Sequence, residues 1–95
     1  MIKSFADRTT EDIYNGSNTK AARRIDKRVW PVVFRKLDIL NAAVSLNDLK
    51  SPGNRLERLK DDLAGCWSIR VNDQYRVTFR FEGGNALDVS CQDIH

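Results

Sequence analysis

The stretch from Gly65 to Phe81, GCWSIRVNDQYRVTFRF, constrains the fold of this chain more than any other. Apolar and polar residues alternate along it on both sides of residues 72–74. Alternation with a period of two is the pattern of a half-buried strand. Two such strands joined by residues that favour turns predict a β-hairpin.

The two faces of these strands indicate the register of the hairpin, because opposite residues of an antiparallel pair point to the same side. A two-residue loop at 72–73 would set Ile69 opposite Arg76 and mix apolar with charged residues. A three-residue loop, 72–74, makes one face wholly apolar. It pairs Val71 with Tyr75, Ile69 with Val77, and Trp67 with Phe79. We expect a left-handed residue in this loop, which Asn or Asp tolerates best.

The same register makes Arg70 and Arg76 direct neighbours on the polar face, with Arg80 further along it. Like charges directly opposite repel. The pair therefore indicates either a solvated basic face or a site where an anion lies between the two side chains. Arginine suits phosphate because its planar fork gives two parallel charge-assisted hydrogen bonds.

The composition, with 41% apolar and 31% charged residues over 95 positions, predicts one globular domain, 1–95, with a modest core. No apolar run approaches the roughly 20 residues of a membrane helix, and the first residues lack a signal-peptide core. We therefore expect a cytoplasmic protein without membrane contact. Cys66 and Cys91 have no zinc-type spacing, so we expect free buried thiols, and no motif indicates a metal or cofactor.

Basic residues are concentrated between Lys20 and Lys36, where seven stand against the single acid Asp26. Such a block attracts polyanions through counterion release. It is equally typical of the solvated side of a helix.

Two helices are expected before the hairpin. Thr10 offers the N-cap of a short helix that ends at the polar loop 15–18. Apolar residues at spacings of three and four predict the main helix over 26–43. That helix begins either at 26, with a bend at Pro31, or near Val29.

Three further strands are expected. Residues 2–5 are interpreted as a brief first strand, and 53–60, GNRLERLK, as a strand beside the hairpin, although a helix is an alternative. Residues 86–95 alternate again, and the glycine-rich turn 82–85 returns them beside 75–81. This carries His95 towards the arginine-bearing sheet.

These residues suggest cleavage of RNA without a metal, in which a base removes the ribose 2′-hydroxyl proton and an acid protonates the departing 5′-oxygen. Arg70 and Arg76 would stabilise the charge that develops on the phosphorane. His95 could be the acid, against the alternative of a frayed chain end. Lys60 and Glu57 are alternative bases, or ordinary surface charges.

The run SPGNRLERLKDDLAGCWSIRVNDQYRVTFRF, with a chain ending in QDIH, resembles the HigB-type, or plasmid-maintenance killer, toxins of the RelE/ParE superfamily. The resemblance covers nearly the whole chain and is strongest over 52–81. It implies an α+β fold in which two N-terminal helices pack on one face of a small antiparallel RelE-like β-sheet. It also implies a toxin of a type II toxin-antitoxin system, a ribosome-dependent messenger-RNA endonuclease (mRNA interferase) that inhibits translation without a metal.

The partners implied by this resemblance are a HigA-type helix-turn-helix antitoxin, the ribosome and messenger RNA, with DNA reached only through the antitoxin complex. The matching catalytic positions are Lys60, Arg70, Arg76, Asp93 and His95. Related toxins commonly have Tyr where Ile94 stands, and some have His where Glu57 stands. These departures leave catalysis to Lys60, Arg76 and His95, or make it slow.

Two alternatives stay open beside this interpretation. One is a toxin of the same fold with another target, such as gyrase, because fold does not fix function. The other is a non-catalytic module whose basic surface only holds an acidic antitoxin segment or helps a complex to dock on DNA.

Overall fold

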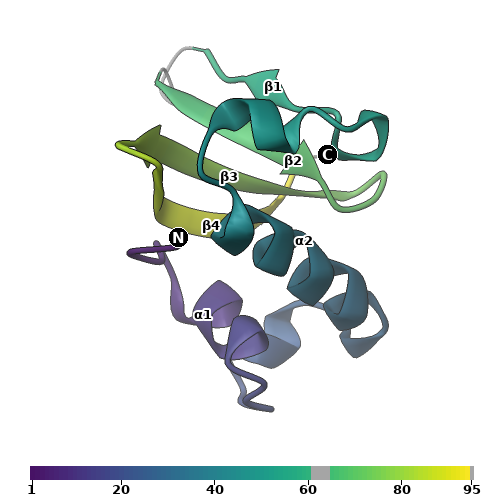
Figure 1. Cartoon of the computed structure of the whole chain (residues 1–95). Helices are drawn as coiled ribbons and strands as arrows, with labels where there is room; N and C mark the ends of the chain where they lie inside the picture. Colours follow the sequence, from purple (N-terminus) through teal and green to yellow (C-terminus); the bar gives the residue numbers. More distant parts are fainter. Residues whose placement is uncertain (61–64, 95) are drawn as a thin grey trace.

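The computed structural model describes residues 1–60 and 65–94 of the chain. In this part, two α-helices lie on one side of a four-stranded antiparallel sheet with the order β1-β2-β3-β4 (Figure 1). The helices are α1 (Arg8–Tyr14) and α2 (Trp30–Ala42), and the strands are β1 (Glu57–Arg58), β2 (Cys66–Arg70), β3 (Tyr75–Glu82) and β4 (Asn85–Asp93). Short 3-10 helices are η1 (Ala22–Arg24), η2 (Lys27–Val29), η3 (Leu46–Leu49) and η4 (Pro52–Asn54). The expected α+β fold is confirmed.

The N-cap of α1 lies three residues before the expected cap. Asp7 is the N-cap, and its Oδ1 accepts a hydrogen bond from the Thr10 amide at 2.7 Å. The prediction of Thr10 as the cap was wrong, because Asp7 offers an equally good cap oxygen one turn earlier. Thr10 is instead buried, and its Oγ1 accepts a hydrogen bond from the Cys91 amide at 2.8 Å.

Helix α2 begins at Trp30, so the later of the two expected starts is confirmed. Pro31 lies in its first turn, where its missing N–H costs no intrahelical hydrogen bond. The helix buries Val33, Leu37 and Leu40 completely against the sheet. This spacing of four and three residues is the apolar stripe of an amphipathic helix.

The register of the central hairpin is confirmed: Trp67 lies opposite Phe79, Ile69 opposite Val77, and Arg70 opposite Arg76. The expectation of a left-handed loop residue was wrong, because positive φ among non-glycine residues of the described part occurs at Arg55 and Asp88. The Asn72 side chain closes the loop instead. Its Oδ1 accepts hydrogen bonds from the amides of residues 74 and 75 at 2.9 and 2.7 Å, an Asx turn.

The strand expected over 53–60 is confirmed only in its centre. Glu57 and Arg58 pair with β2, opposite Ser68 and Trp67. Residues 52–54 form η4, and Arg55 then adopts a left-handed conformation at φ 42° and ψ 56°. The left-handed conformation is energetically unfavourable for a residue other than glycine. It turns the Arg55 carbonyl towards the sheet, where Arg76 donates a hydrogen bond to it.

The outer edge of β4 is covered by the N-terminal segment along its first half. The Lys3 amide donates to the Ala86 carbonyl at 2.8 Å, and the Ala6 amide donates to the Val89 carbonyl at 2.9 Å. The expected strand over 2–5 is present as two isolated parallel bridges, at Ile2 and Phe5. A bulge at Asp88, φ 52°, shifts the pairing of β4 with β3 between these two contacts.

Both cysteines are free thiols, as expected, but only Cys91 is buried, whereas Cys66 is half-buried. Burial raises the pKa of Cys91 from 9.0 to about 12. No helix in the described part of the chain is long and apolar enough to cross a membrane.

We expect Cys66 to react with a thiol reagent at pH 8 at least about tenfold faster than Cys91, since the thiolate is the nucleophile and Cys91 keeps its proton. Because the folded pKa of Cys91 is the higher one, the stability that it contributes is present below pH 9 and lost between pH 9 and about 12. Mass spectrometry of timed labelling measures the two rates. Equal rates in the native protein, and not only in urea, would contradict this prediction.

Candidate functional site

Arg76 on β3 is the most constrained of the expected catalytic residues. It is 7% exposed. Its Nε donates to Ser68 Oγ at 2.7 Å, and its Nη2 donates to the carbonyls of Ser68, at 3.2 Å, and of Arg55. The guanidinium thus joins β2, β3 and the turn before β1. Burial lowers its pKa, while the nearby charge of Glu57 opposes this shift.

One nitrogen of Arg76 remains available to a ligand. Nη1 donates no hydrogen bond within the described residues. No buried side-chain nitrogen or oxygen in this part of the chain lacks a partner, so Nη1 is not fully buried. The side chain therefore combines a fixed orientation with one nitrogen that no described residue occupies, the arrangement expected of a group that stabilises a developing negative charge.

Arg70 and Arg76 lie directly opposite one another, and carboxylates offset the repulsion between them. Arg70 Nη2 lies 2.7 Å from Asp73 Oδ1, and Arg76 Nη2 lies 3.9 Å from Glu57 Oε2. The pair therefore does not need a bound anion to be stable. Of the two alternatives for this face, a solvated basic face is wrong at Arg76, which is buried beside Ser68, while Arg70 is half-buried.

A buried lysine on α2 holds the segment that carries the Arg55 carbonyl. Lys36 Nζ donates to Asn54 Oδ1 at 2.7 Å and to the Gly53 carbonyl at 3.3 Å. Asn54 Nδ2 in turn donates to the Leu49 carbonyl at 3.2 Å. Burial lowers the pKa of Lys36, with smaller contributions from Arg35 and Arg70. The sequence did not single out Lys36 for this role, because its place in the basic block indicated solvent exposure.

We expect Lys36→Met to lower the free energy of unfolding by about 1–3 kcal/mol, because it leaves the buried Asn54 oxygen unpaired. Urea unfolding followed by tryptophan fluorescence measures the change. Arg35→Met is the matched control: it removes the same charge from the same helix turn at an exposed position, and should cost less than about 0.5 kcal/mol. Equal stability of the two variants would show that the Lys36 contacts contribute nothing.

Lys60 lies away from the arginine pair. The Leu59 amide donates to the Cys66 carbonyl at 2.9 Å, and Cys66 pairs with Arg80. Leu59, Cys66 and Arg80 therefore lie side by side across the sheet. Arg80 is four residues from Arg76 along β3, a distance of roughly 13 Å at the rise of a β-strand. Glu57, at 3.9 Å, is the nearer of the two candidate bases.

Asp93 is the last residue of β4 and lies at the end of the sheet where the hairpin loop joins β2 to β3. It pairs with Tyr75, and its Oδ2 accepts a hydrogen bond from Gln74 Nε2 at 2.9 Å. The preceding residue, Gln92, lies directly opposite Arg76. The register thus brings the end of β4 close to the arginine pair. His95, the other expected residue of this strand end, lies outside the described residues.

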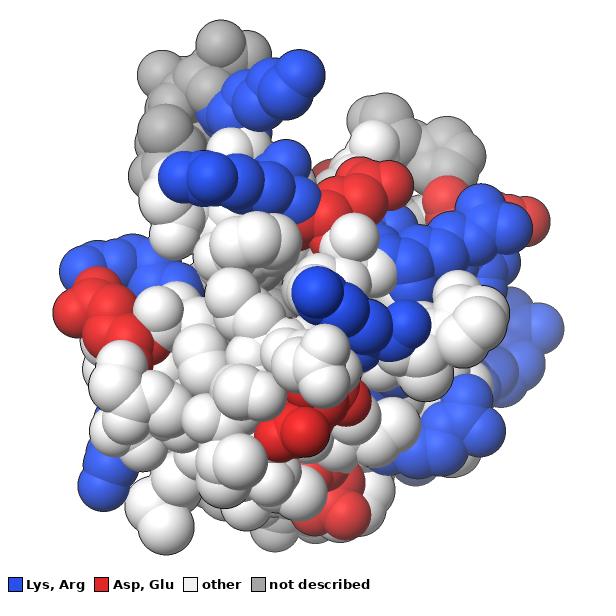
Figure 2. All heavy atoms as spheres, turned by 45° about the horizontal axis from the view of Figure 1, so that its top comes forward, with Lys and Arg blue, Asp and Glu red and all other residues white. Residues whose placement is uncertain are grey.

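Positive charge surrounds these residues. The pKa of Arg76 is influenced by Arg55 and Arg70, and that of Lys36 by Arg35 and Arg70, so these side chains form one cationic cluster. Figure 2 shows lysine and arginine side chains most densely at the right of the view, with others at its top and left, around a broad uncharged surface. Such a surface favours a polyanionic ligand. Among the described residues, no group of three or more His, Cys, Asp or Glu side chains could hold a metal ion.

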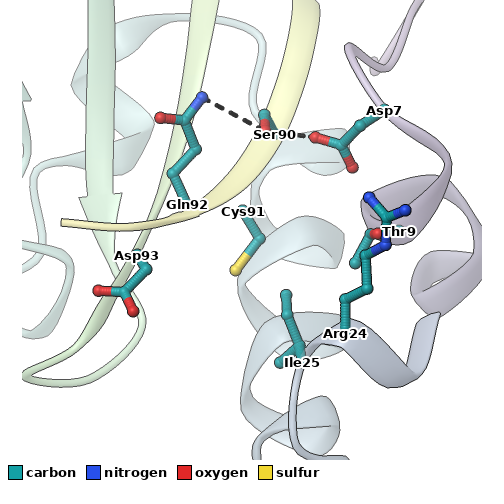
Figure 3. Close-up of a pocket in the computed structure, with 8 residues that line it drawn as sticks. All are labelled: Asp7, Thr9, Arg24, Ile25, Ser90, Cys91, Gln92 and Asp93. Carbon is teal, nitrogen blue, oxygen red and sulfur yellow. Dashed lines mark hydrogen bonds between the residues drawn. The ribbon is translucent and has the colours of Figure 1, made fainter. Parts of the chain in front are cut away.

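A hollow of about 410 Å³ lies at the end of β4, between residues 90–93 and the N-terminal part of the helical layer (Figure 3). Asp7, Thr9, Arg24 and Ile25 form its other wall. No sequence pattern indicated this hollow, because its two walls come from opposite ends of the chain.

Comparisons with known proteins agree with this architecture. A family model described as "RelE-like toxin of type II toxin-antitoxin system HigB" matches residues 3–95. "Toxin HigB-1" of Vibrio cholerae is 43% identical over 89 residues, which is 93% of this chain and 92% of that protein. "Endoribonuclease HigB" of Proteus vulgaris is 29% identical over 97 residues and covers all of both chains.

Two solved structures are similar in fold. The toxin-antitoxin assembly "YoeB-YefM complex from Staphylococcus aureus" contains a chain that matches with a TM-score of 0.61 and 17% identity, over 100% of this chain and 98% of that one. The "YoeB/ParE toxin from Agrobacterium tumefaciens" matches with a TM-score of 0.57 and 21% identity, over 99% and 100%. At these identities the likeness concerns the fold alone.

Proposed function

We propose, from the premise that this chain belongs to the HigB-like family of RelE-like toxins of type II toxin-antitoxin systems, that it cuts messenger RNA on the ribosome. The observation that carries the proposal is the fixed Arg76 guanidinium, of which one nitrogen, Nη1, makes no hydrogen bond to a described residue. The name of the Proteus vulgaris relative, an endoribonuclease, supports the same activity.

In the proposed reaction, a base removes the proton of the ribose 2′-hydroxyl, and the 2′-oxygen attacks the adjacent phosphorus. The bond from phosphorus to the 5′-oxygen breaks as an acid protonates that oxygen, leaving a 2′,3′-cyclic phosphate and a 5′-hydroxyl. Arg76, with Arg70 beside it, stabilises the charge on the phosphorane. This chemistry needs no metal or other cofactor.

The proton-transfer roles go to residues at the ends of the strands. Glu57 is favoured as the base by its distance of 3.9 Å from Arg76, and Lys60 is then a contact to the RNA backbone. His95, with Asp93 near it in sequence, supplies the acid. Ile94 brings no hydroxyl to this strand end, so the acid step depends on His95.

The proposed partners follow from the family and the charge. The ribosome and messenger RNA bind the cationic cluster, which places the toxin in the cytoplasm. A HigA-type helix-turn-helix antitoxin neutralises it, and DNA is bound only through that complex.

The test is 5′-end mapping of messenger RNA after brief induction of the toxin without antitoxin, repeated with purified toxin and one messenger RNA with and without ribosomes. New ends in translated frames, present only with ribosomes, are expected. Cuts of equal rate in free RNA would overturn the ribosome dependence. Growth arrest without new ends would overturn the nuclease function and move the search to gyrase or to another target.

A further inference from the structure

The hollow at the end of β4 is lined mainly by polar side chains, with one small apolar area at Ile25 and Cys91 that we call its floor. Ile25 is 4% exposed and Cys91 is 9% exposed, and Figure 3 shows the Cys91 sulfur pointing towards Ile25. With its pKa raised to about 12 by burial, the Cys91 thiol stays neutral at physiological pH. A neutral apolar floor suits the face of a flat ring rather than a charged group.

The edge of β4 presents backbone groups beside this floor. The Cys91 amide donates outward to Thr10 Oγ1 at 2.8 Å, whereas the Ile94 amide donates inward to the Gln74 carbonyl at 3.0 Å. On an edge strand, a residue that directs its N–H away from the sheet directs its carbonyl the same way. The Cys91 carbonyl therefore faces outward, where it can accept a hydrogen bond from a ligand.

Arg24 is the cation of the hollow that remains available. Its side chain is exposed and makes no hydrogen bond or ion pair within the described residues. Figure 3 shows it beside Thr9, reaching towards Asp7. The Asp7 carboxylate accepts hydrogen bonds from the Thr10 amide at 2.7 Å and from Ser90 Oγ at 2.5 Å, and no ion pair joins it to Arg24.

An apolar floor, a carbonyl acceptor and a forked donor are the features that recognise a nucleobase. Arginine binds adjacent acceptors on a base edge bidentately, and N7 and O6 of guanine are one such pair. Sequence-specific RNA recognition mostly uses bases that are unstacked and hydrogen-bonded on their edges. A volume of about 410 Å³ lies within the range of small-molecule sites.

We propose that this hollow binds one unpaired base of the RNA, next to the phosphate held at Arg76. The hollow and the candidate site share one strand end, since Gln92 lines the hollow and pairs with Arg76. The inference rests on the proposed function, because it takes the RNA substrate as the ligand. It adds to that function a site which would influence where the RNA is cut.

The test is a titration of the ¹⁵N-labelled toxin with each of the four ribonucleosides, and with inorganic phosphate as a separate probe. We expect saturable shifts of the amides of residues 91–93 with at least one nucleoside. Arg24→Ala should weaken that binding at least about tenfold. Arg23→Ala is the matched control, since Arg23 carries the same charge on the same short helix but donates to Asn18 at 3.0 Å; it should change binding less than about twofold.

Three outcomes would overturn the proposal: no saturable shift with any nucleoside, the same shifts with inorganic phosphate alone, or equal weakening by the two variants. Nucleoside binding needs neither a ribosome nor cleavage. A toxin that cuts messenger RNA but binds no nucleoside would therefore refute the base site alone. A toxin that binds a nucleoside in this hollow but makes no cuts would keep the site and refute the nuclease function.

Discussion

Arg76→Lys is expected to lower the rate of RNA cleavage by at least about 100-fold, the loss typical of one electrostatic donor in an active site. The substitution keeps the charge. A lysine ammonium, however, cannot present two donors in a planar fork to Ser68 and Arg55 and a further donor to the substrate. The lost hydrogen bonds should also lower the free energy of unfolding by about 1–3 kcal/mol. Single-turnover cleavage on programmed ribosomes and urea unfolding measure the two effects separately.

Arg80→Lys is the control for this experiment, because Arg80 lies on the same strand but is exposed and paired with Glu82 and Asp88. Its cleavage rate should stay within about threefold of the wild type, and its stability within about 0.5 kcal/mol. Cleavage by Arg76→Lys at a rate near that of the wild type would remove Arg76 from the reaction and leave it a purely structural role.

Phe79→Ala should produce the largest loss of stability of any single substitution considered, about 3–5 kcal/mol. Phe79, on β3, is 1% exposed and is the largest fully buried side chain of the described residues, in the hydrophobic core. Its ring also meets the edge of Phe81 at 6.3 Å between centroids. Because domains of this size are stable by only about 5–15 kcal/mol, the variant should unfold at a much lower urea concentration.

Phe81→Ala is the comparison that separates burial from the ring contact. Either substitution removes the contact between the two rings, but Phe81 is only half-buried. It should cost less than half as much. Equal losses would mean that the aromatic contact, and not the cavity, dominates the effect of Phe79→Ala.

The sequence predicted the register of the central hairpin better than it predicted where the first helix begins. Trp67, Ile69 and Val77 gave the hairpin register directly, because a shift of one residue would have reversed every side chain. The N-cap of α1 was predicted wrongly, because two residues in this segment are suited to that position. Asp7 and Thr10 are both good caps, and which of them starts α1 depends on the contact of Thr10 with β4.

The sequence predicted which charged residues of the candidate site lie together, but not that Arg76 is buried. The pairing of Arg70 with Arg76 followed from the register. That Ser68 and the Arg55 carbonyl would hold the guanidinium did not, because it depends on a left-handed turn at Arg55 and on the Lys36 contact with Asn54. Such contacts join segments far apart in the chain, and a local pattern cannot show them.

The pairing of the N-terminal segment with β4 joins two segments that lie far apart in the sequence. Lys3 and Ala6 bind Ala86 and Val89, more than 80 positions later. Non-local pairing of this kind cannot form until both segments are free to meet. A nascent chain still lacking β4 therefore cannot complete the sheet or the strand end that carries Asp93. Closing this edge of the sheet is thus a non-local step, which should be slower than the local pairing of β2 with β3.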